Sequence, residues 1–196
     1  MNDEELKQLL QERRDEEACN LHFNPRLDLL MNSDYCNSLN NLIHRQGAIW
    51  ERMLATPALG AMLPNEPGIY MFVWKPVLSL RFIASPESEQ FTWVLYIGKS
   101  GTEGSTTATI RQRYLGEYNK YVGKNAVCLW DVADPQNREE KLSRFLTLRP
   151  LEFWYLTMNN ASEILRLETK LIRVLRPPLN KQHAVTLRSG KKQPVI

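Results

Sequence analysis

Three runs of apolar and aromatic residues stand out along the middle of the chain, each bounded by glycine, proline or polar residues. They cover residues 69–74, 91–97 and 151–156 and are rich in β-branched and aromatic side chains, which favours buried β-strands. The segment between the first two runs contains Pro86 and is too long for a tight hairpin, but its length permits two antiparallel neighbours. The pattern predicts a small three-stranded sheet of antiparallel type.

Apolar residues at helical spacing occupy the segments around and after these strands. Helices are predicted over about residues 108–118, 136–147 and 164–175, and the last is preceded by the capping residue Asn160 and ended by Pro177. The order strand, strand, helix, strand, helix is typical of an α/β domain in which helices flank a small sheet.

The first part of the chain is predicted to be a helical N-terminal extension. Residues 3–18 are charged and helix-prone, and apolar residues, among them Ile49, Trp50 and Met53, recur at near-helical spacing over 39–53. The stretch between these two segments is rich in Asn, Asp and Pro, which predicts a loop. The predicted parts are an extension over 1–66, a domain over 67–181 and a basic tail over 182–196. The extension is open to two roles, a dimer arm or a specificity element.

Charge is distributed unevenly around a formal net value of +3. Residues 1–20 hold seven acidic and three basic residues, whereas from Lys170 to the end there are seven basic residues and no acidic ones. A basic end suggests contact with nucleic acid or another anionic surface, and a solubilising tail is an equal alternative on charge alone. The residues expected to add phosphate contacts in the tail are Lys181, Arg188, Lys191 and Lys192.

The cysteines and histidines give no sign of a disulfide framework or a zinc site. Cys19, Cys36 and Cys128 lack CxxC spacing, and no two histidines lie at ligand spacing. The N-terminus is acidic, unlike a secretory signal, and no apolar run approaches the roughly 20 residues of a membrane span. A cytoplasmic protein with reduced thiols is expected.

Two tripeptides at the first two predicted strands carry the candidate chemistry. Gly68-Ile69-Tyr70 and Tyr96-Ile97-Gly98, in this order, resemble the paired signature of the GIY-YIG endonuclease family. Three later residues agree with that family's pattern: an arginine in the next helix, a glutamate in an apolar helix and an asparagine after a proline turn, here Arg113, Glu168 and Asn180. The resemblance extends from about residue 67 to residue 181.

The resemblance implies a DNA endonuclease that hydrolyses phosphodiester bonds in one step with an activated water and one divalent metal ion. Glu168 would hold the metal, Mg²⁺ or alternatively Mn²⁺, because a single carboxylate with waters and phosphate oxygens suits Mg²⁺. Glu168 also stands out without the family, since it interrupts an apolar helical face in a segment rich in Lys and Arg. The plain alternative is a helix glutamate paired with Arg166 or Arg173.

The resemblance also implies roles for an arginine and two tyrosines. Arg113 would bind the scissile phosphate and stabilise the transition state, with Arg111 as the competing candidate and a further DNA contact. Tyr96 would orient or deprotonate the attacking water, assisted by Tyr70. Free tyrosine has a pKa of about 10 and is ionised in roughly one molecule in a thousand at pH 7, so it needs a nearby cation. Lys99 is the expected cation, and the metal ion is the second candidate.

Two positions fit the pattern less simply. The family usually places His or Tyr four residues after its arginine, whereas here Glu117 stands at that place and Tyr118 follows one residue later. Counting from Arg111 gives Leu115. Tyr118 is kept as a DNA-binding candidate. Asn180 would anchor the backbone or the phosphate near the site, and a simple turn residue after the double proline is the alternative.

Other functions were weighed against a DNA nuclease. Gly98-Lys99-Ser100 resembles the end of a Walker loop, but Trp93 stands where that motif requires glycine, which excludes an NTPase of this type. A non-catalytic DNA-binding module on the same fold, a structure-specific repair nuclease and an RNA substrate stay open. A restriction-like or mobile-element nuclease is preferred, because no linker to a separate DNA-binding domain is recognised and the chain is short for the excision-repair subunit. Cutting both strands would need a homodimer or successive nicks.

Overall fold

The computed structural model describes residues 21–44, 49–76, 79–81, 88–101, 108–124 and 135–180. All statements below concern these residues. The predicted helix over 3–18 and the basic tail over 182–196 lie outside them. So do four of the predicted DNA contacts, Lys181, Arg188, Lys191 and Lys192.

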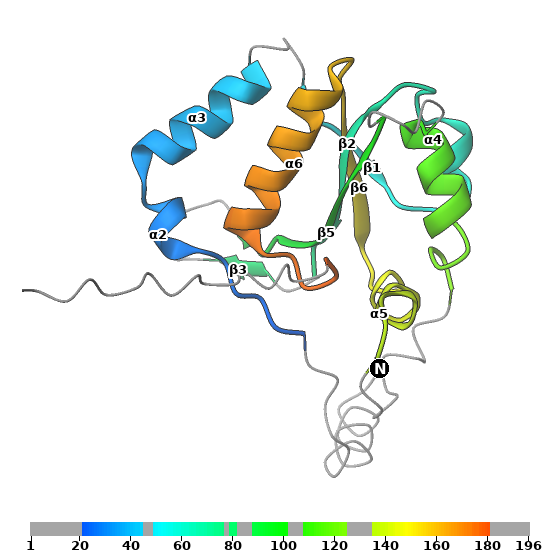
Figure 1. Cartoon of the computed structure of the whole chain (residues 1–196). Helices are drawn as coiled ribbons and strands as arrows, with labels where there is room; N and C mark the ends of the chain where they lie inside the picture. Colours follow the sequence, from blue (N-terminus) through cyan, green and yellow to red (C-terminus); the bar gives the residue numbers. More distant parts are fainter. Residues whose placement is uncertain are drawn as a thin grey trace, which may run out of the picture.

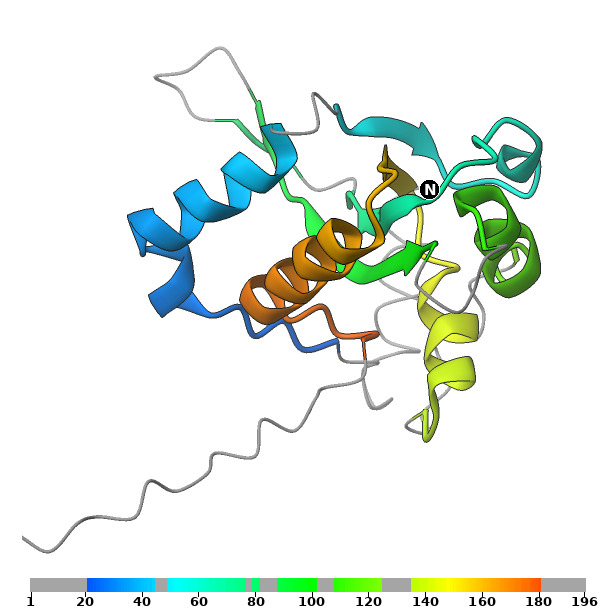
Figure 2. The same ribbon diagram turned by 45° about the horizontal axis from the view of Figure 1, so that its top comes forward.

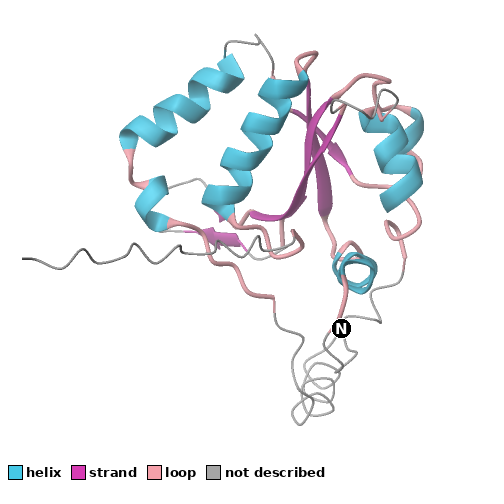
Figure 3. Cartoon of the chain, viewed as in Figure 1, coloured by secondary structure: helices cyan, strands magenta, loops and turns pink. Residues whose placement is uncertain are grey.

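The core of the fold is a four-stranded antiparallel sheet with the order β1-β6-β2-β5 (Figures 1 and 3). The three predicted strands are confirmed as β2 (Gly68–Trp74), β5 (Trp93–Ser100) and β6 (Leu151–Thr157). The α/β class is also confirmed. The prediction of three strands was wrong by one, because β1 (Glu51–Leu54) pairs with β6 at the edge.

Strand β1 lies within the segment that was predicted to be helical, so the all-helical extension is also wrong. Its register with β6 runs from Glu51 opposite Tyr155 to Leu54 opposite Glu152. Only Met53 turns toward the core, where it packs against the buried cluster, and its neighbours in the strand are exposed. A four-residue edge strand with one inward side chain is too short to show the alternation of apolar and polar residues that marks a strand. Met53 lies by coincidence at helical spacing from the apolar residues before it, and this produced the wrong prediction.

Helices cover both faces of the sheet (Figure 2). On one face lies α6 (Ala161–Leu175), with α3 (Ser33–His44) and the short α2 (Leu27–Leu30) beside it. On the other face lie α4 (Ile110–Arg113), its continuation η2 (Tyr114–Tyr118), the turn η1 (Leu59–Ala61) and α5 (Arg138–Phe145). A two-stranded hairpin of β3 (Ser79–Arg81) and β4 (Ser88–Gln90) lies between β2 and β5 in sequence.

Side-chain caps explain where these helices begin. Thr109 forms a capping box with Gln112 at α4, Asn137 accepts a bond from the Glu140 amide at α5, and Asn160 caps α6 as predicted. Asn32, in the stretch predicted to be a loop, accepts a bond from the Tyr35 amide at the start of α3. Helix α2 and the first half of α3 thus correct that loop prediction, because an asparagine can cap a helix as well as form a turn. Residues 39–44 of α3 lie in the segment that was predicted to be helical.

Strand alternation divides the core into two clusters and thereby positions the candidate site. Tyr70 and Phe72 of β2 face α4, η2 and α5, whereas Ile69 and Met71 face α6. Strands β2 and β5 are antiparallel neighbours, with Tyr70 opposite Gly98. The two tripeptides therefore lie side by side, and the rings of both tyrosines belong to the same face of the sheet.

The contact between these strands gives a test based on two glycines. A Cβ added at Gly98 would lie 2.6 Å from the Tyr70 ring, whereas a Cβ added at Gly116 in η2 would meet nothing within 4 Å. We expect Gly98→Ala to lower the free energy of unfolding by about 1–3 kcal/mol through overpacking. We expect Gly116→Ala to be neutral or stabilising by up to about 1 kcal/mol. Chemical denaturation of both variants checks this, and equal effects would contradict the packing described.

Candidate active site

Three tyrosines from three elements meet on the face of the sheet that α4, η2 and α5 cover. The Tyr70 and Tyr118 hydroxyls are 2.9 Å apart, and the Tyr96 ring lies 5.7 Å from the Tyr118 ring, centroid to centroid. Tyr118 is fully buried, Tyr70 is 2% exposed and Tyr96 is 9% exposed. Tyr96 is therefore the least enclosed of the three.

Two arginines and a glutamate border the tyrosines. Glu117 forms an ion pair with Arg113 and a second with Arg138, whose Nη2 lies 3.2 Å from the Glu117 Oε2. The same Arg138 nitrogen donates to the Tyr96 hydroxyl at 3.1 Å and to the Tyr118 hydroxyl at 3.4 Å. Its guanidinium also lies 5.4 Å from the centroid of the Tyr96 ring, within reach of a cation–π contact. One guanidinium thus joins two tyrosines to the Glu117 carboxylate.

The structure distinguishes the two arginines that competed for the phosphate role. Arg111 donates from Nε to the Leu63 carbonyl oxygen at 2.6 Å, a contact that fastens α4 to the loop after η1. Arg113 instead faces the tyrosines and Glu117, and its buried Nε–H has no acceptor among the described residues. This geometry favours Arg113 as the arginine of the site.

The spacing between Arg113 and Tyr118 is explained by the form of the helix between them. Residues Tyr114–Tyr118 form a π-helical turn, in which the Asn119 amide donates to the Tyr114 carbonyl at 2.8 Å. A π turn holds one residue more than an α turn, so the fifth residue after Arg113 can face the site where the fourth would be expected in an α-helix. Tyr118 thereby joins the other tyrosines, and Glu117 takes the adjacent position beside both arginines.

Burial sets the protonation of two tyrosines. It is the largest cause that raises the pKa of Tyr70 and the pKa of Tyr118 far above the ordinary value. Tyr96 raises both further, and the hydrogen bond with Tyr118 offsets part of the rise at Tyr70. Both therefore stay protonated at neutral pH and act as hydrogen-bonding groups, not as bases. Burial also opposes ionisation of Glu117, but its bonds and charge contacts with Arg113 and Arg138 outweigh burial and lower its pKa.

Lys99 and Glu168 meet on the opposite face of the sheet. Lys99 lies three residues after Tyr96, so strand alternation turns it toward α6, where it forms an ion pair with Glu168. Their side chains are 25% and 13% exposed. Lys99 is thus not the cation that contacts the Tyr96 hydroxyl. Arg138 makes that contact, and no spacing rule in the sequence links it to Tyr96.

The Lys99 contact also decides how Glu168 is paired. Among the described residues its ion-pair partner is Lys99, so the alternative pairing with Arg166 or Arg173 is not observed. No group of three or more His, Cys, Asp or Glu side chains suited to a metal occurs in the described ranges. A single carboxylate fits a Mg²⁺ or Mn²⁺ ion that keeps waters and takes substrate oxygens, and does not fit a zinc cage.

Asn180 anchors the backbone of β5. Its Oδ1 accepts from the Ile97 amide at 2.9 Å and its Nδ2 donates to the Ile97 carbonyl oxygen at 2.8 Å. The amide of Leu179 donates to the Leu95 carbonyl at 3.0 Å, so the chain after α6 pairs with the outer edge of β5. Both polar atoms of the Asn180 side chain bind backbone, which favours the anchoring role over phosphate contact.

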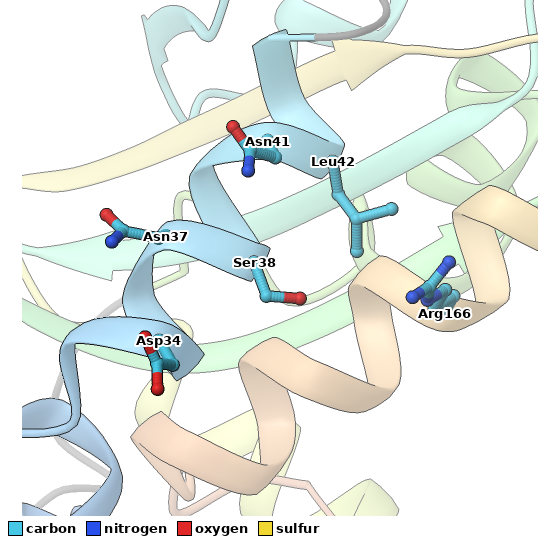
Figure 4. Close-up of a pocket in the computed structure, with 6 residues that line it drawn as sticks. All are labelled: Asp34, Asn37, Ser38, Asn41, Leu42 and Arg166. Carbon is cyan, nitrogen blue, oxygen red and sulfur yellow. The ribbon is translucent and has the colours of Figure 1, made fainter.

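A cavity of about 250 Å³ lies away from these residues, between α3 and α6 (Figure 4). It is lined by Asp34, Asn37, Ser38, Asn41, Leu42 and Arg166. Figure 4 shows Ser38 and Leu42 on the side of α3 that faces α6, with Arg166 across the gap. None of the predicted site residues borders this cavity.

Comparisons with known proteins add no relative to this description. No protein-family model matches the chain, and no match is found among curated proteins or solved structures. Within the described ranges, no helix combines the length and the apolar character needed to cross a membrane.

The two hydrogen bonds between the Asn180 side chain and the Ile97 backbone, called the Asn180 clamp below, predict a stability effect. Asn180→Ala leaves the Ile97 amide and carbonyl without these partners, so we expect the free energy of unfolding to fall by about 1–3 kcal/mol. Amide hydrogen exchange at Ile97 should accelerate at the same time. Asn40→Ala, at an exposed position of α3, is the matched control and should change neither quantity. Normal protection of the Ile97 amide in Asn180→Ala would contradict the clamp.

The lowered pKa of Glu117 predicts how stability depends on pH. Because the folded-state pKa lies below the ordinary value of 4.5, the ion pairs stabilise the protein above about pH 4.5. This contribution is lost as the pH falls through the folded-state pKa. We expect Glu117→Gln to cost about 1 kcal/mol at pH 7 and progressively less below pH 4.

Urea denaturation at several pH values measures this difference. Glu66→Gln changes an exposed glutamate with no ion pair among the described residues and serves as the control. A cost of Glu117→Gln that stays constant from pH 7 to pH 3 would argue against the two ion pairs.

Proposed function

We propose that this protein is a metal-dependent endonuclease of the GIY-YIG type that hydrolyses DNA phosphodiester bonds. The observation that carries the proposal is the meeting of Tyr70, Tyr96 and Tyr118 with Arg113, at the junction of two adjacent antiparallel strands. Tyr70, Tyr96 and Arg113 were expected as catalytic residues and Tyr118 as a DNA contact, and the four come from β2, β5, α4 and its continuation η2. Their convergence supports a shared site.

The charges of this cluster suit an anionic substrate. Arg113 and Arg138 both present guanidinium groups, which bind phosphate through paired N–H donors. In the proposed reaction water attacks phosphorus, the bond to the leaving oxygen breaks, and Arg113 stabilises the additional charge of the transition state. The resemblance assigns a metal ion to Glu168, where it would supply Lewis-acid stabilisation of that charge. Because Glu168 lies with Lys99 on the opposite face of the sheet from the tyrosines, the scissile phosphate would have to reach it around the end of β5.

Tyr96 is the proposed group that orients the attacking water and takes up its proton. Tyr96 is the least buried of the three residues, and its hydroxyl accepts a hydrogen bond from Arg138. Arg138 thus supplies the cation that a base of this kind needs and that was first expected of Lys99. Tyr70 and Tyr118, which stay protonated, hold the position of the network by hydrogen bonds.

The second candidate is a DNA-binding module without catalysis. The observation in its favour is the ion pair between Glu168 and Lys99, since a carboxylate that holds a lysine competes with metal binding. In a nuclease, Glu168 could hold the metal ion only after Lys99 of β5 has left this ion pair. Metal-dependent cleavage decides between the two.

Cleavage of plasmid DNA with Mg²⁺ or Mn²⁺ is the direct test. We expect the wild type to cut, Glu168→Gln to lose at least about a hundredfold in rate, and Tyr96→Phe to lose a similar factor. Glu163→Gln, on the same helix, is the matched control and should retain activity. If the wild type yields no product with either metal but still binds duplex DNA, the binding module becomes the better assignment.

The biological setting forms part of the same proposal. A restriction-like or mobile-element nuclease in the cytoplasm is preferred, acting as a homodimer or by successive nicks, and the basic tail over 182–196 would add phosphate contacts. A structure-specific repair nuclease is the alternative role. Mapping the cut ends on a long duplex reports sequence preference and the number of strands cut. Competition with single-stranded DNA and RNA identifies the substrate class.

A further inference from the structure

Glu117 holds both arginines of the candidate site with one carboxylate. Arg113, from α4, and Arg138, from α5, approach its two oxygens from different elements. Oε1 accepts from Arg113 and Oε2 accepts from Arg138. Two oxygens that share a negative charge and accept from two guanidiniums make the same kind of contact as the two non-bridging oxygens of a phosphodiester.

The arginines have more donors than Glu117 can satisfy. A guanidinium carries five N–H groups, and the Arg113 Nε–H is buried with no acceptor among the described residues. Glu117 is the carboxylate that both ion pairs share, so the group of three carries a net positive charge. An anion with further acceptor oxygens would satisfy this group better than Glu117 does.

We propose that Glu117 is an internal competitor for the substrate phosphate, and that Arg113 and Arg138 together form the phosphate subsite. The proposal rests on the proposed function, because it takes a phosphodiester of DNA as the ligand of this pair. In the free protein the carboxylate accepts hydrogen bonds from both guanidiniums. When DNA binds, a phosphodiester displaces the carboxylate, so part of the binding energy is used to release Glu117.

A purely structural ion-pair bridge between η2 and α5 makes the opposite prediction. If Glu117 only holds the two arginines in place, its removal should disorder them and weaken anion binding. If Glu117 competes with phosphate, its removal should strengthen binding. The sign of the change therefore separates the two roles.

Binding is measured in EDTA, without catalysis, using inorganic phosphate and a short DNA duplex as probes. We expect Glu117→Gln to bind both about tenfold more tightly than the wild type, since a competing charge-assisted hydrogen-bond acceptor is removed. Glu139→Gln removes the same charge from a glutamate that pairs with Lys120 instead, so it is the matched control. It should change affinity by less than about twofold.

A second variant tests the role of Arg138. Arg138→Gln should weaken phosphate binding in the wild-type background and should abolish most of the gain in the Glu117→Gln background. A gain that is unaffected by Arg138→Gln would remove Arg138 from the subsite. Unchanged or weaker binding by a folded Glu117→Gln protein would overturn the proposal.

A measurement on the wild type keeps the proposal testable if Glu117→Gln does not fold. The ¹³C resonance of the Glu117 carboxyl should shift and saturate as inorganic phosphate is added, because the carboxylate loses its arginine partners. A resonance that does not move while phosphate binds would overturn the proposal.

The outcome is separable from that of the cleavage test. If Glu117→Gln strengthens phosphate binding as expected but the wild type does not cleave DNA, the phosphate subsite is supported and the nuclease proposal is overturned. Cleavage together with a failed Glu117 response would leave the nuclease and overturn this inference alone.

Discussion

The packing of the Tyr70 ring against Gly98 is the contact on which the candidate site depends. A Cβ at position 98 would lie 2.6 Å from the ring, so a larger residue would separate the strands or push the ring outward. With glycine, the ring is buried between β2 and β5, and its hydroxyl comes within 2.9 Å of the Tyr118 hydroxyl. Asn180 holds the same strand from its outer edge. Strand β5 is thus fixed from both sides, and the position of Tyr96 follows.

Most of the fold could be predicted from the sequence because its main elements carry strong local signals. Strands β2, β5 and β6 are continuous apolar runs, and α6 has a capping asparagine, an apolar face and a terminating proline. Strand β1 could not be predicted, because it depends on pairing with β6 and turns only Met53 toward the core. The first half of helix α3 was missed because Asn32 has the same local chemistry in a turn and in a cap, whereas its second half lies in the segment predicted to be helical.

The candidate site was less predictable, for reasons of geometry. Strand alternation explains why Tyr70 and Tyr96 share a face, and the same rule applied from Tyr96 to Lys99 would have placed the lysine on the other face. Arg138 is different. It reaches Tyr96 from a helix whose position depends on tertiary packing, so no spacing in the sequence indicates the contact. The contact of Glu117 with both Arg113 and Arg138 depends on the π turn, which the sequence pattern did not reveal.

That wide turn has a consequence for how the site can change over generations. An additional codon in an ordinary helix rotates every later side chain by about 100° and disrupts the packing of the whole element. Here the extra residue is confined to one turn, so Tyr118 keeps its place beside Tyr70 while a carboxylate appears between the two arginines. Gain or loss of one residue at this turn would therefore change which side chain lies beside Arg113 and Arg138, while the packing of the other helices is left as it is.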